Sequence, residues 1–348
     1  MTAPLLPLQS TSANRSTCRV AVAIKCIGVL FVLWGIASWV RLSGPLMASP
    51  SPLDDNGTTT LVIDGEVEYL SSTGRPGALE SAVPVKASST VRKHTDRVAV
   101  IIEDRPLGNL VPILLHFHSV LGPEWPIILY TSPPTSETLL TSASLARAVA
   151  SASIEIRHLP PETTFSSHAS VSQFLTSRFI WTDLAPYLKI LLFQTDSILC
   201  SASPRHIDEF LPYDFIGAPI LARFGTGFNG GLSLRNRELI LRVLDRWDFA
   251  VDSAAEDAPT EWKFEDQWFY ARMRELGEDP ELRGELGVSV DLPDQQVAAS
   301  MAVETIWVDG ARPLGFHQPQ RWQSQHIDDI MEYCPEVGMI AGSSFFGR

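Results

Sequence analysis

Asp196 is the first residue whose type and position could support chemistry. It follows Gln194 and Thr195 in KILLFQTDSILCS (189–201), directly after the short apolar run 190–193. Such a run is typical of a buried strand, and Mg²⁺ or Mn²⁺ is often held by one or two carboxylates together with substrate oxygens. The position therefore suits a divalent cation at a strand end. On the tripeptide alone, an Asp that caps the following turn is the simpler interpretation.

Glycines surround Phe228 and Asn229 in GTGFNGGLS (225–233). The order is not that of a phosphate loop, which requires Gly-x-x-x-x-Gly-Lys. Four glycines that lead into an apolar alternation indicate backbone passing close to a ligand. An ordinary glycine turn before a strand explains the spacing equally well.

An acidic pair and a late histidine complete the set of residues that could act in chemistry. Glu265 and Asp266 open the predicted helix FEDQWFYARMREL, where an acid could serve as a general base or simply complement the helix dipole. His317 lies in GFHQPQRW and could complete a metal site built mainly from oxygens. Taken singly, both features have adequate structural explanations.

Strands and amphipathic helices alternate in the part of the chain that must position these residues. The expected strands lie in VAVIIED, WPIILYTSPP, SIEIRHLP and residues 190–193. One expected helix includes Leu110 and the apolar positions after it, and the others span 139–152 and 170–183. The alternation predicts an α/β fold with a mostly parallel, doubly wound sheet. In such sheets ligands bind beyond the carboxyl ends of the strands, where Asp196 lies.

Residues 20–40 predict a transmembrane segment, because 21 helical residues span about 31 Å, close to the thickness of a bilayer core. Basic residues before this segment and acidic residues after it predict a cytoplasmic N-terminus and a lumenal remainder. A cleaved signal peptide ending near residues 47–49 is the alternative. The expected organisation is a cytoplasmic tail (1–19), a signal anchor (20–40), a flexible stem with a hairpin near 60–70 (41–94), and a lumenal domain (95–348).

Two further features suit the secretory pathway. Asn56 begins the glycosylation sequon Asn-Gly-Thr just beyond the membrane segment. Cys200 and Cys334 lie in the expected lumenal part, where they could form a disulfide, although two buried free thiols are equally compatible with the sequence.

Composition limits the classes of function. Of 348 residues, 45% are hydrophobic and 19% charged, which allows a large core and excludes global disorder. The net charge of −13 argues against a duplex nucleic-acid binder, which needs clustered basic residues.

Taken in order, several strings resemble nucleotide-sugar-dependent glycosyltransferases of the GT-A fold, and more closely a domain-of-unknown-function family grouped with them. These strings are IIEDRPL, VLGPEWPI, LLFQTDSILC, YDFIGAPI, FNGGLSLRNR and EDQWFY. The resemblance covers residues 97–322. It implies a donor such as a UDP- or GDP-sugar, a glycan or glycoconjugate acceptor, and Mn²⁺ or Mg²⁺ on the donor diphosphate.

The resemblance also implies roles for individual residues. The acidic motif of the fold, often Asp-x-Asp, corresponds to Gln194-Thr195-Asp196, with an amide in place of the first acid. Asp196 would then be the main metal ligand and His317 another, while Gln194 and Thr195 would contact the donor.

Four further residues take roles from the same resemblance. Glu103 and Arg105 would lie near the nucleotide, because the first strand of the fold ends there. Asn229 and Gly230 would line the donor or acceptor pocket. Asp266 would match the acid that acts as base in inverting members.

Together these observations predict a Golgi or ER membrane protein, single-pass type II, that transfers a sugar from a nucleotide-sugar to a hydroxyl. The alternative is a catalytically inactive sugar-binding or scaffold protein with the same fold. A hydrolase ranks last, because the sequence contains neither a Gly-x-Ser-x-Gly nor a His-Glu-x-x-His motif.

Overall fold

The computed structural model describes residues 59–63, 66–70 and 96–340 of the chain. The predicted tail (1–19) and membrane segment (20–40) lie outside the described residues. Within the described ranges, no helix is long and apolar enough to cross a bilayer.

The chain divides into two units, Met1–Ala87 and Ser88–Arg348, and each is described by itself. In the first unit, β1 (Thr59–Ile63) and β2 (Glu66–Leu70) form an antiparallel pair. This pair confirms the hairpin expected near residues 60–70. The remaining elements belong to the second unit.

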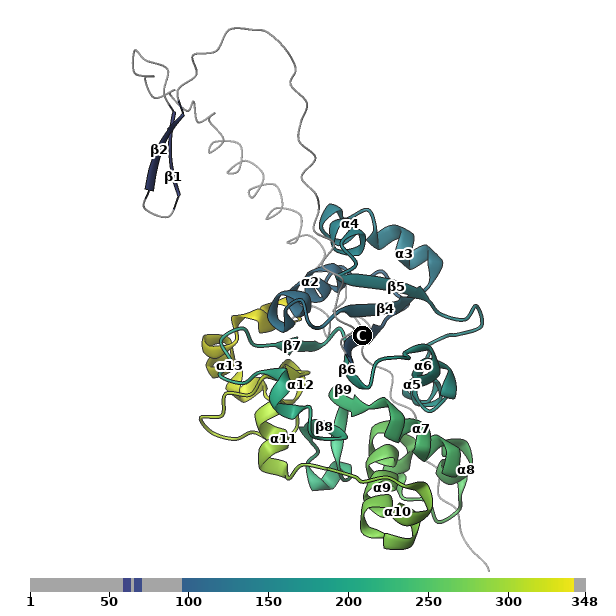
Figure 1. Ribbon diagram of the computed structural model, residues 1–348. Helices are drawn as coiled ribbons and strands as arrows, with labels where there is room; N and C mark the ends of the chain where they lie inside the picture. The colour runs from purple at the N-terminus through teal and green to yellow at the C-terminus, as the bar shows by residue number, and fades with distance from the viewer. Residues whose placement is uncertain (1–58, 64–65, 71–95, 341–348) are drawn as a thin grey trace, which may run out of the picture. The chain divides into compact units, whose positions relative to one another are not determined.

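A six-stranded sheet is the centre of the second unit (Figure 1). Its spatial order is β5 (Ile154–His158), β4 (Ile127–Thr131), β3 (Arg97–Ile102), β6 (Lys189–Phe193), β9 (Phe228–Asn236) and β8 (Phe215–Pro219). Strands β5, β4, β3 and β6 run parallel, whereas β9 runs antiparallel to both β6 and β8. The sheet is therefore mostly parallel, as predicted, with one reversed strand.

A smaller sheet joins the segment after β6 to the last part of the chain. Its order is β10 (Ala302–Val303), β11 (Gly315–His317) and β7 (Ser197–Leu199), with β11 antiparallel to β7. His317 pairs with Ser197 in this register. The pairing therefore brings the C-terminal histidine beside the end of β6.

Helices cover both faces of the central sheet. In chain order they are α2 (Leu110–Leu121), α3 (Pro133–Leu139), α4 (Ala143–Ala150), α5 (His168–Leu175), α6 (Arg178–Asp183), α7 (Arg237–Arg246), α8 (Phe249–Ala254), α9 (Glu265–Glu278), α10 (Pro280–Leu286), α11 (Gln295–Met301), α12 (Pro319–Trp322) and α13 (Ile327–Tyr333). Short 3₁₀ segments are η1 (Ile207–Phe210), η2 (Ala222–Phe224), η3 (Thr260–Lys263), η4 (Ser324–His326) and η5 (Pro335–Met339). Helices α5 to α10 lie on one side of the sheet, and α2, α11, α12 and α13 lie with the small sheet on the other (Figure 1).

The central strands are buried because both faces of the sheet are covered. Residues 98–101 of β3 and 127–130 of β4 are fully buried and apolar. Continuous apolar runs of this kind are typical of parallel strands with helices on both sides. These continuous apolar runs are the feature that made the strands recognisable in the sequence.

The helix expected over residues 170–183 is in fact two helices, α5 and α6. The hydroxyls of Thr176 and Ser177 donate hydrogen bonds to carbonyls in the last turn of α5. Because those carbonyls are then satisfied locally, the helix ends there. The helix expected over 139–152 is likewise shorter, since α4 begins only after the separate helix α3 has ended.

Cys200 and Cys334 form a disulfide, which resolves the two alternatives left by the sequence. Both cysteines are buried, and 134 residues separate them. The bond joins the residue after β7 to the residue after α13. It therefore fixes the C-terminal segment against the small sheet.

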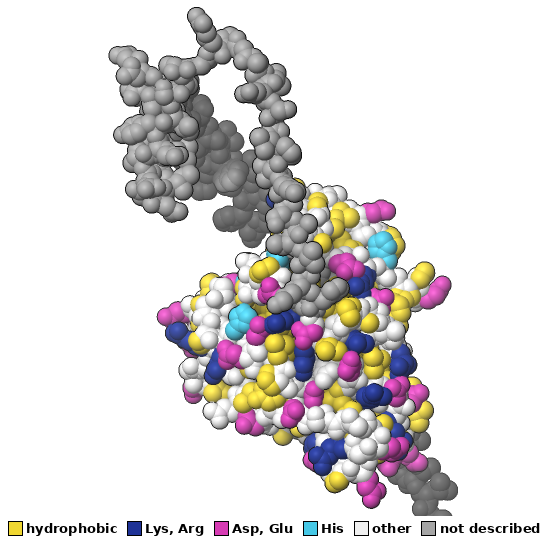
Figure 2. All heavy atoms as spheres, viewed as in Figure 1, with side chains coloured by type: hydrophobic (Ala, Val, Ile, Leu, Met, Phe, Trp, Pro, Cys, Tyr) yellow, Lys and Arg dark blue, Asp and Glu magenta, His cyan; other side chains and the backbone are white. Residues whose placement is uncertain are grey.

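The visible face of the molecule carries charges of both signs. In Figure 2, Lys and Arg side chains alternate with Asp and Glu side chains over this face of the second unit. A duplex-binding face would instead gather basic side chains along a strip.

Replacement of Cys334 by Ser should lower the free energy of unfolding by about 2–5 kcal/mol, because the disulfide closes a long loop in the unfolded chain. Urea denaturation of purified Cys334→Ser and wild-type protein measures the difference. Cys18→Ser is the control, because this cysteine is not one of the disulfide pair. Equal unfolding midpoints for Cys334→Ser and wild type would contradict the prediction.

Candidate functional site

The order of the strands reverses between β3 and β6. From β3 the chain proceeds outward to β4 and β5, and it then returns to β6 on the other side of β3. Because β3 and β6 are parallel neighbours, Glu103 and Gln194 leave the sheet at the same edge. A crevice at such a reversal is where open α/β sheets bind ligands. The side-chain amide of Asn109 spans this edge, donating to the carbonyl of Thr195 at 3.2 Å.

Glu103 holds the guanidinium of Arg105 at the end of β3. Glu103 is buried and accepts hydrogen bonds from the Arg105 backbone N–H at 3.0 Å, from Nε at 2.8 Å and from Nη2 at 2.9 Å. These hydrogen bonds are the main cause of the raised pKa of Arg105, and the charge of Asp196 adds to them. The side chain of Arg105 remains 65% exposed. The crevice therefore presents an oriented, exposed cation.

Asp196 lies in the turn between β6 and β7, where the C-terminal segment contacts it twice. Gln318 donates its backbone N–H to the Asp196 carbonyl at 2.9 Å and its side-chain amide to Oδ2 at 2.7 Å. Oδ1 lies 3.3 Å from Nε2 of His317. The turn itself is fixed to β9, since the N–H of Gln194 donates to the Gly231 carbonyl.

His317 is buried among three acceptors. Its Nδ1 lies 3.0 Å from Oε1 of Glu304, and its Nε2 lies near both Asp196 and Oε1 of Gln194, the latter at 3.2 Å. Burial alone would lower the pKa of the imidazole, but Asp196 and Glu304 raise it to about 10. Burial likewise opposes the ionisation of Asp196, yet the imidazolium lowers its pKa to about 2. At neutral pH the two form a charged pair.

Three atoms that could act as metal ligands lie close together where the sequence predicts a metal. Oδ1 of Asp196 and Oε1 of Gln194 lie 3.3 Å and 3.2 Å from Nε2 of His317. Ligands about 2.1 Å from an octahedral cation are separated by about 3 Å, so this spacing suits Mg²⁺ or Mn²⁺ once the ring has lost its proton. The described residues contain no group of three or more His, Cys, Asp or Glu that could hold a metal ion. The amide of Gln194 would therefore be the third ligand.

Gly230 and Gly231 make room for side chains of the protein itself. A Cβ at Gly231 would lie 2.3 Å from Nε2 of His317. A Cβ at Gly230 would lie 2.6 Å from Nη2 of Arg235 and 3.1 Å from Cβ of Asp266. Because successive residues of a strand face opposite sides, His317 and Asp266 lie on opposite faces of β9. Close packing by these side chains explains the two glycines.

Asp266 is buried at the start of α9. Its Oδ2 accepts the N–H of Gly230 and its Oδ1 accepts the N–H of Gln267, both at 2.8 Å. Burial is the main cause that raises the pKa of Asp266 to about 7. The charge of Glu265 adds to this effect, and the charge of Arg235 opposes it. A carboxyl with this pKa can exchange a proton at neutral pH.

Glu265 forms a different kind of interaction from its neighbour. It pairs with the fully buried Arg235 at 3.0 Å, and the guanidinium of Arg235 lies 4.9 Å from the ring centre of Phe215. This acid therefore has a structural role between α9 and β9. Only the second acid of the predicted pair remains a candidate for catalysis.

The structure thus brings the predicted residues into two groups. The first joins Glu103, Arg105, Gln194, Thr195, Asp196 and His317 at the ends of β3 and β6. The second joins Asn229, Gly230 and Asp266 across β9, where Oδ1 of Asn229 accepts the N–H of Gly231 at 2.7 Å. Gly231 lies between the groups, because its N–H donates to Asn229 and a Cβ at this position would meet His317.

Two residues of the site were missed by the sequence interpretation. Glu304 follows the apolar β10 directly, the same arrangement of a strand and an acid that identified Asp196. Gln318 adopts a left-handed backbone conformation with φ 47°, which the sequence gives no signal for. Glu304 orients His317, and Gln318 orients Asp196, each by a direct hydrogen bond.

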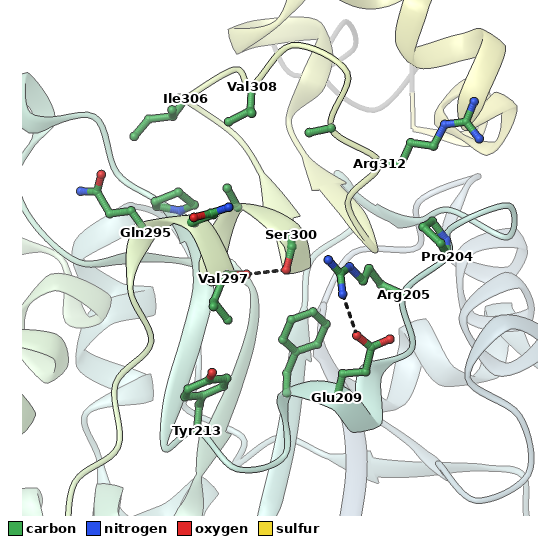
Figure 3. A pocket seen from close by; sticks show the side chains of 15 residues that line it. Pro204, Arg205, Glu209, Tyr213, Gln295, Val297, Ser300, Ile306, Val308 and Arg312 are labelled. Carbon is green, nitrogen blue, oxygen red and sulfur yellow. Dashed lines mark hydrogen bonds and ion pairs between the residues drawn. The ribbon is translucent and has the colours of Figure 1, made fainter.

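A separate cavity of about 620 Å³ lies between η1, α11 and the segment after Glu304 (Figure 3). Arg205 and Glu209 form an ion pair in its wall, opposite Val297 and Ser300 of α11. None of the predicted site residues is among the residues that line it. The cavity and the crevice are therefore distinct features.

Comparisons with known proteins give one family match and several distant structural likenesses. A family model described as a protein of unknown function (DUF5672) matches residues 153–317. This range contains the predicted site residues except Glu103 and Arg105. No curated protein matches the chain.

Solved structures of glycosyltransferases show a distant likeness. The apo-form of the glycosyltransferase GlyE of Streptococcus pneumoniae TIGR4 is 15% identical, with a TM-score of 0.36, over 64% of this chain and 54% of that one. Core-mannan synthase A (CmsA/Ktr4) of Aspergillus fumigatus, in its Mn/GDP-form, is 10% identical, with a TM-score of 0.32, over 61% of this chain and 80% of that one. This chain thus spans about half the length of the pneumococcal protein. Scores of this size determine neither the fold nor the function of the chain.

Replacement of Gly231 by Ala should destabilise the protein by about 1–3 kcal/mol, because the new methyl group would overlap the imidazole of His317. Thermal and urea unfolding of the variant measure the loss. Gly284→Ala is the matched control, since a Cβ there meets nothing within 4 Å. An effect of Gly231→Ala no larger than that of the control would contradict the packing argument.

The imidazole of His317 should carry both protons at pH 8 in metal-free protein, because Asp196 and Glu304 raise its pKa to about 10. The folded pKa lies above the unfolded value of about 6.5, so the pair stabilises the fold below pH 6.5 and this contribution is lost as the pH rises toward 10. Nitrogen-15 NMR of histidine-labelled protein between pH 6 and 10 measures the protonation, with His317→Gln to assign the signal. Titration of His317 near pH 6.5 would contradict the charged pair.

Proposed function

We propose that the protein is a glycosyltransferase that moves a sugar from a nucleotide-sugar donor to a hydroxyl of an acceptor. The observation that carries this proposal is the convergence of Arg105 and Asp196 at the reversal between β3 and β6. Arg105 offers an exposed cation. Asp196 offers a carboxylate, and two further potential metal ligands, on His317 and Gln194, lie beside it. This is the chemistry that a diphosphate requires at a sheet edge. The order of the sequence strings supports the same class.

The donor diphosphate would lie between Arg105 and Asp196. Arg105 can bind phosphate oxygens by two parallel hydrogen bonds, because Glu103 holds its guanidinium in one orientation. Asp196, Gln194 and His317 would hold Mn²⁺ or Mg²⁺. When bound, this cation offsets the negative charge of the diphosphate, including the charge that develops as it leaves.

Asp266 is the residue we assign as general base. In the transfer, the acceptor oxygen forms a bond to the anomeric carbon as the bond from that carbon to the diphosphate breaks. The acceptor proton passes to the carboxylate of Asp266, and the nucleoside diphosphate leaves with the bonding electrons. Two backbone N–H groups orient this carboxylate and leave some of its lone pairs unused. Its pKa of about 7 suits proton transfer at neutral pH.

One observation favours the alternative of a catalytically inactive sugar-binding or scaffold protein. The imidazolium of His317 already neutralises Asp196 where the cation would bind. Metal binding must therefore displace a proton, and affinity for the metal should rise with pH. A protein that binds sugars but neither metal nor nucleotide would fit this alternative.

The proposed location is the Golgi or ER membrane, as a single-pass type II protein anchored through residues 20–40. The disulfide between Cys200 and Cys334 supports an oxidising compartment such as the secretory lumen. The basic residues before the membrane segment support the proposed orientation.

Replacement of Asp196 by Asn should abolish metal-dependent nucleotide binding and reduce transfer by at least about 100-fold, because the main metal ligand loses its charge. Calorimetry of the full-length protein with UDP and with GDP, in Mn²⁺ and then in chelator, measures binding. Asp257→Asn is the control, since this aspartate is exposed. Metal-dependent binding that persists in Asp196→Asn would contradict the assignment, and wild-type protein that binds no nucleotide would favour the inactive alternative.

A further inference from the structure

Two aromatic side chains from distant parts of the chain meet beside the candidate site. The rings of Phe224, at the end of η2, and Trp322, at the end of α12, lie 5.1 Å apart in an edge-to-face arrangement. The guanidinium of Arg223 lies 4.7 Å from the ring centre of Phe224, and that of Arg321 lies 4.6 Å from Trp322. These four residues are called the aromatic platform. Phe224 is 39% exposed, so the platform has a face open to solvent.

The platform adjoins both groups of the candidate site. On one side, Arg321 donates to Oε1 of Gln318 at 3.2 Å, and Gln318 in turn donates to Asp196. On the other side, the amide of Gln267, which follows Asp266 in α9, donates to the carbonyl of Phe224 at 3.2 Å. Hydrogen bonds therefore link the platform to the Asp196 group through Gln318 and to the Asp266 group through Gln267.

The charge of the platform is opposite to that of the whole protein. The chain has a net charge of −13, yet Arg223 and Arg321 are exposed and make no ion pair with any carboxylate among the described residues. Most other arginines near aromatic rings here, such as Arg272 beside Trp262, are paired with acids. Two unpaired guanidinium groups on aromatic rings thus leave hydrogen-bond donors free for an anion.

We propose that the aromatic platform binds the acceptor, and that the acceptor is a glycan carrying an acidic sugar. The apolar face of a sugar ring would lie on the exposed ring of Phe224, against which Trp322 packs, and its carboxylate or phosphate would bind Arg223 and Arg321. This proposal rests on the proposed function, because it names the acceptor class of the same site. It places the acceptor hydroxyl between the donor crevice and Asp266.

The donor nucleotide is a poorer occupant of this surface. Its diphosphate has a separate position at the ends of β3 and β6, where Arg105 is exposed. The platform instead lies on η2 and α12, which follow β8 and β11. A nucleotide on the platform would predict that platform variants lose UDP or GDP affinity, and this outcome is part of the test.

The test uses full-length protein and an array of matched oligosaccharide pairs. One member of each pair carries a uronate, sialate or phosphosugar, and the other is its carboxyl-reduced or dephosphorylated counterpart. The variants are Phe224→Leu, which keeps an apolar side chain without a ring, and the double variant Arg223→Gln/Arg321→Gln. Arg246→Gln is the matched control, because Arg246 also lies over a tryptophan, Trp247, but outside the platform. Each sample is also titrated with UDP and GDP in Mn²⁺.

Wild-type protein should bind at least one acidic member at least about tenfold more tightly than its neutral counterpart, as expected for hydrogen bonds to a charged group. The double arginine variant should lose that preference, Phe224→Leu should weaken both members, and Arg246→Gln should behave as wild type. Nucleotide affinity should be equal in all samples.

Equal binding of acidic and neutral members, no binding of any pair, or unchanged binding in the platform variants would overturn the proposal. A loss of nucleotide affinity in those variants would also overturn it, because the platform would then belong to the donor. Failure of the proposed function is a separate result, namely wild-type protein that binds acidic glycans through the platform but binds neither nucleotide.

Discussion

The carboxylate of Asp196 is the point at which the middle of the second unit meets the C-terminal part of the described chain. Through His317 and Gln318 it joins the end of β6 to β11 and α12, more than 120 residues further along the chain. Glu304 holds the other side of the imidazole, so the buried pair of His317 and Glu304 continues from the partly exposed carboxylate of Asp196 across the small sheet. Removal of His317 would leave the carboxylates of Asp196 and Glu304 without their shared counter-charge, which is costly. The geometry of the small sheet, of the platform and of the donor crevice depends on this connection.

The reversed strand β9 divides the site into two chemical environments. On one face, the imidazolium of His317 lowers the pKa of Asp196, and on the other, burial and the charge of Glu265 raise the pKa of Asp266 to about 7. Two carboxyl groups with widely separated pKa values suit different roles, since one can hold a cation or diphosphate while the other exchanges a proton. The adjacent glycines Gly230 and Gly231 permit both groups to approach the same strand.

The sequence predicted the features that depend on local pattern. The buried parallel strands are visible as apolar runs, and Asp196 and Glu103 are visible as acids at strand ends. Long-range contacts left no such signal: the pairing of His317 with Glu304, the contact of Gln318 with Asp196 and the edge-to-face contact of Phe224 with Trp322 all depend on the tertiary fold. The sequence also could not show that Asp266 and His317 lie on opposite faces of β9, because this depends on which way Gly230 and Gly231 face in the folded sheet.

Hydrogen exchange of the full-length protein, with and without UDP or GDP and Mn²⁺, tests the central claim most directly. If a donor diphosphate binds at the reversal between β3 and β6, amides in residues 103–109 and 194–197 should exchange more slowly with the nucleotide present. Amides of residues 205–213, at the cavity in Figure 3, should be unchanged. Protection confined to the cavity, or no protection at either strand end, would contradict the assignment of the donor site.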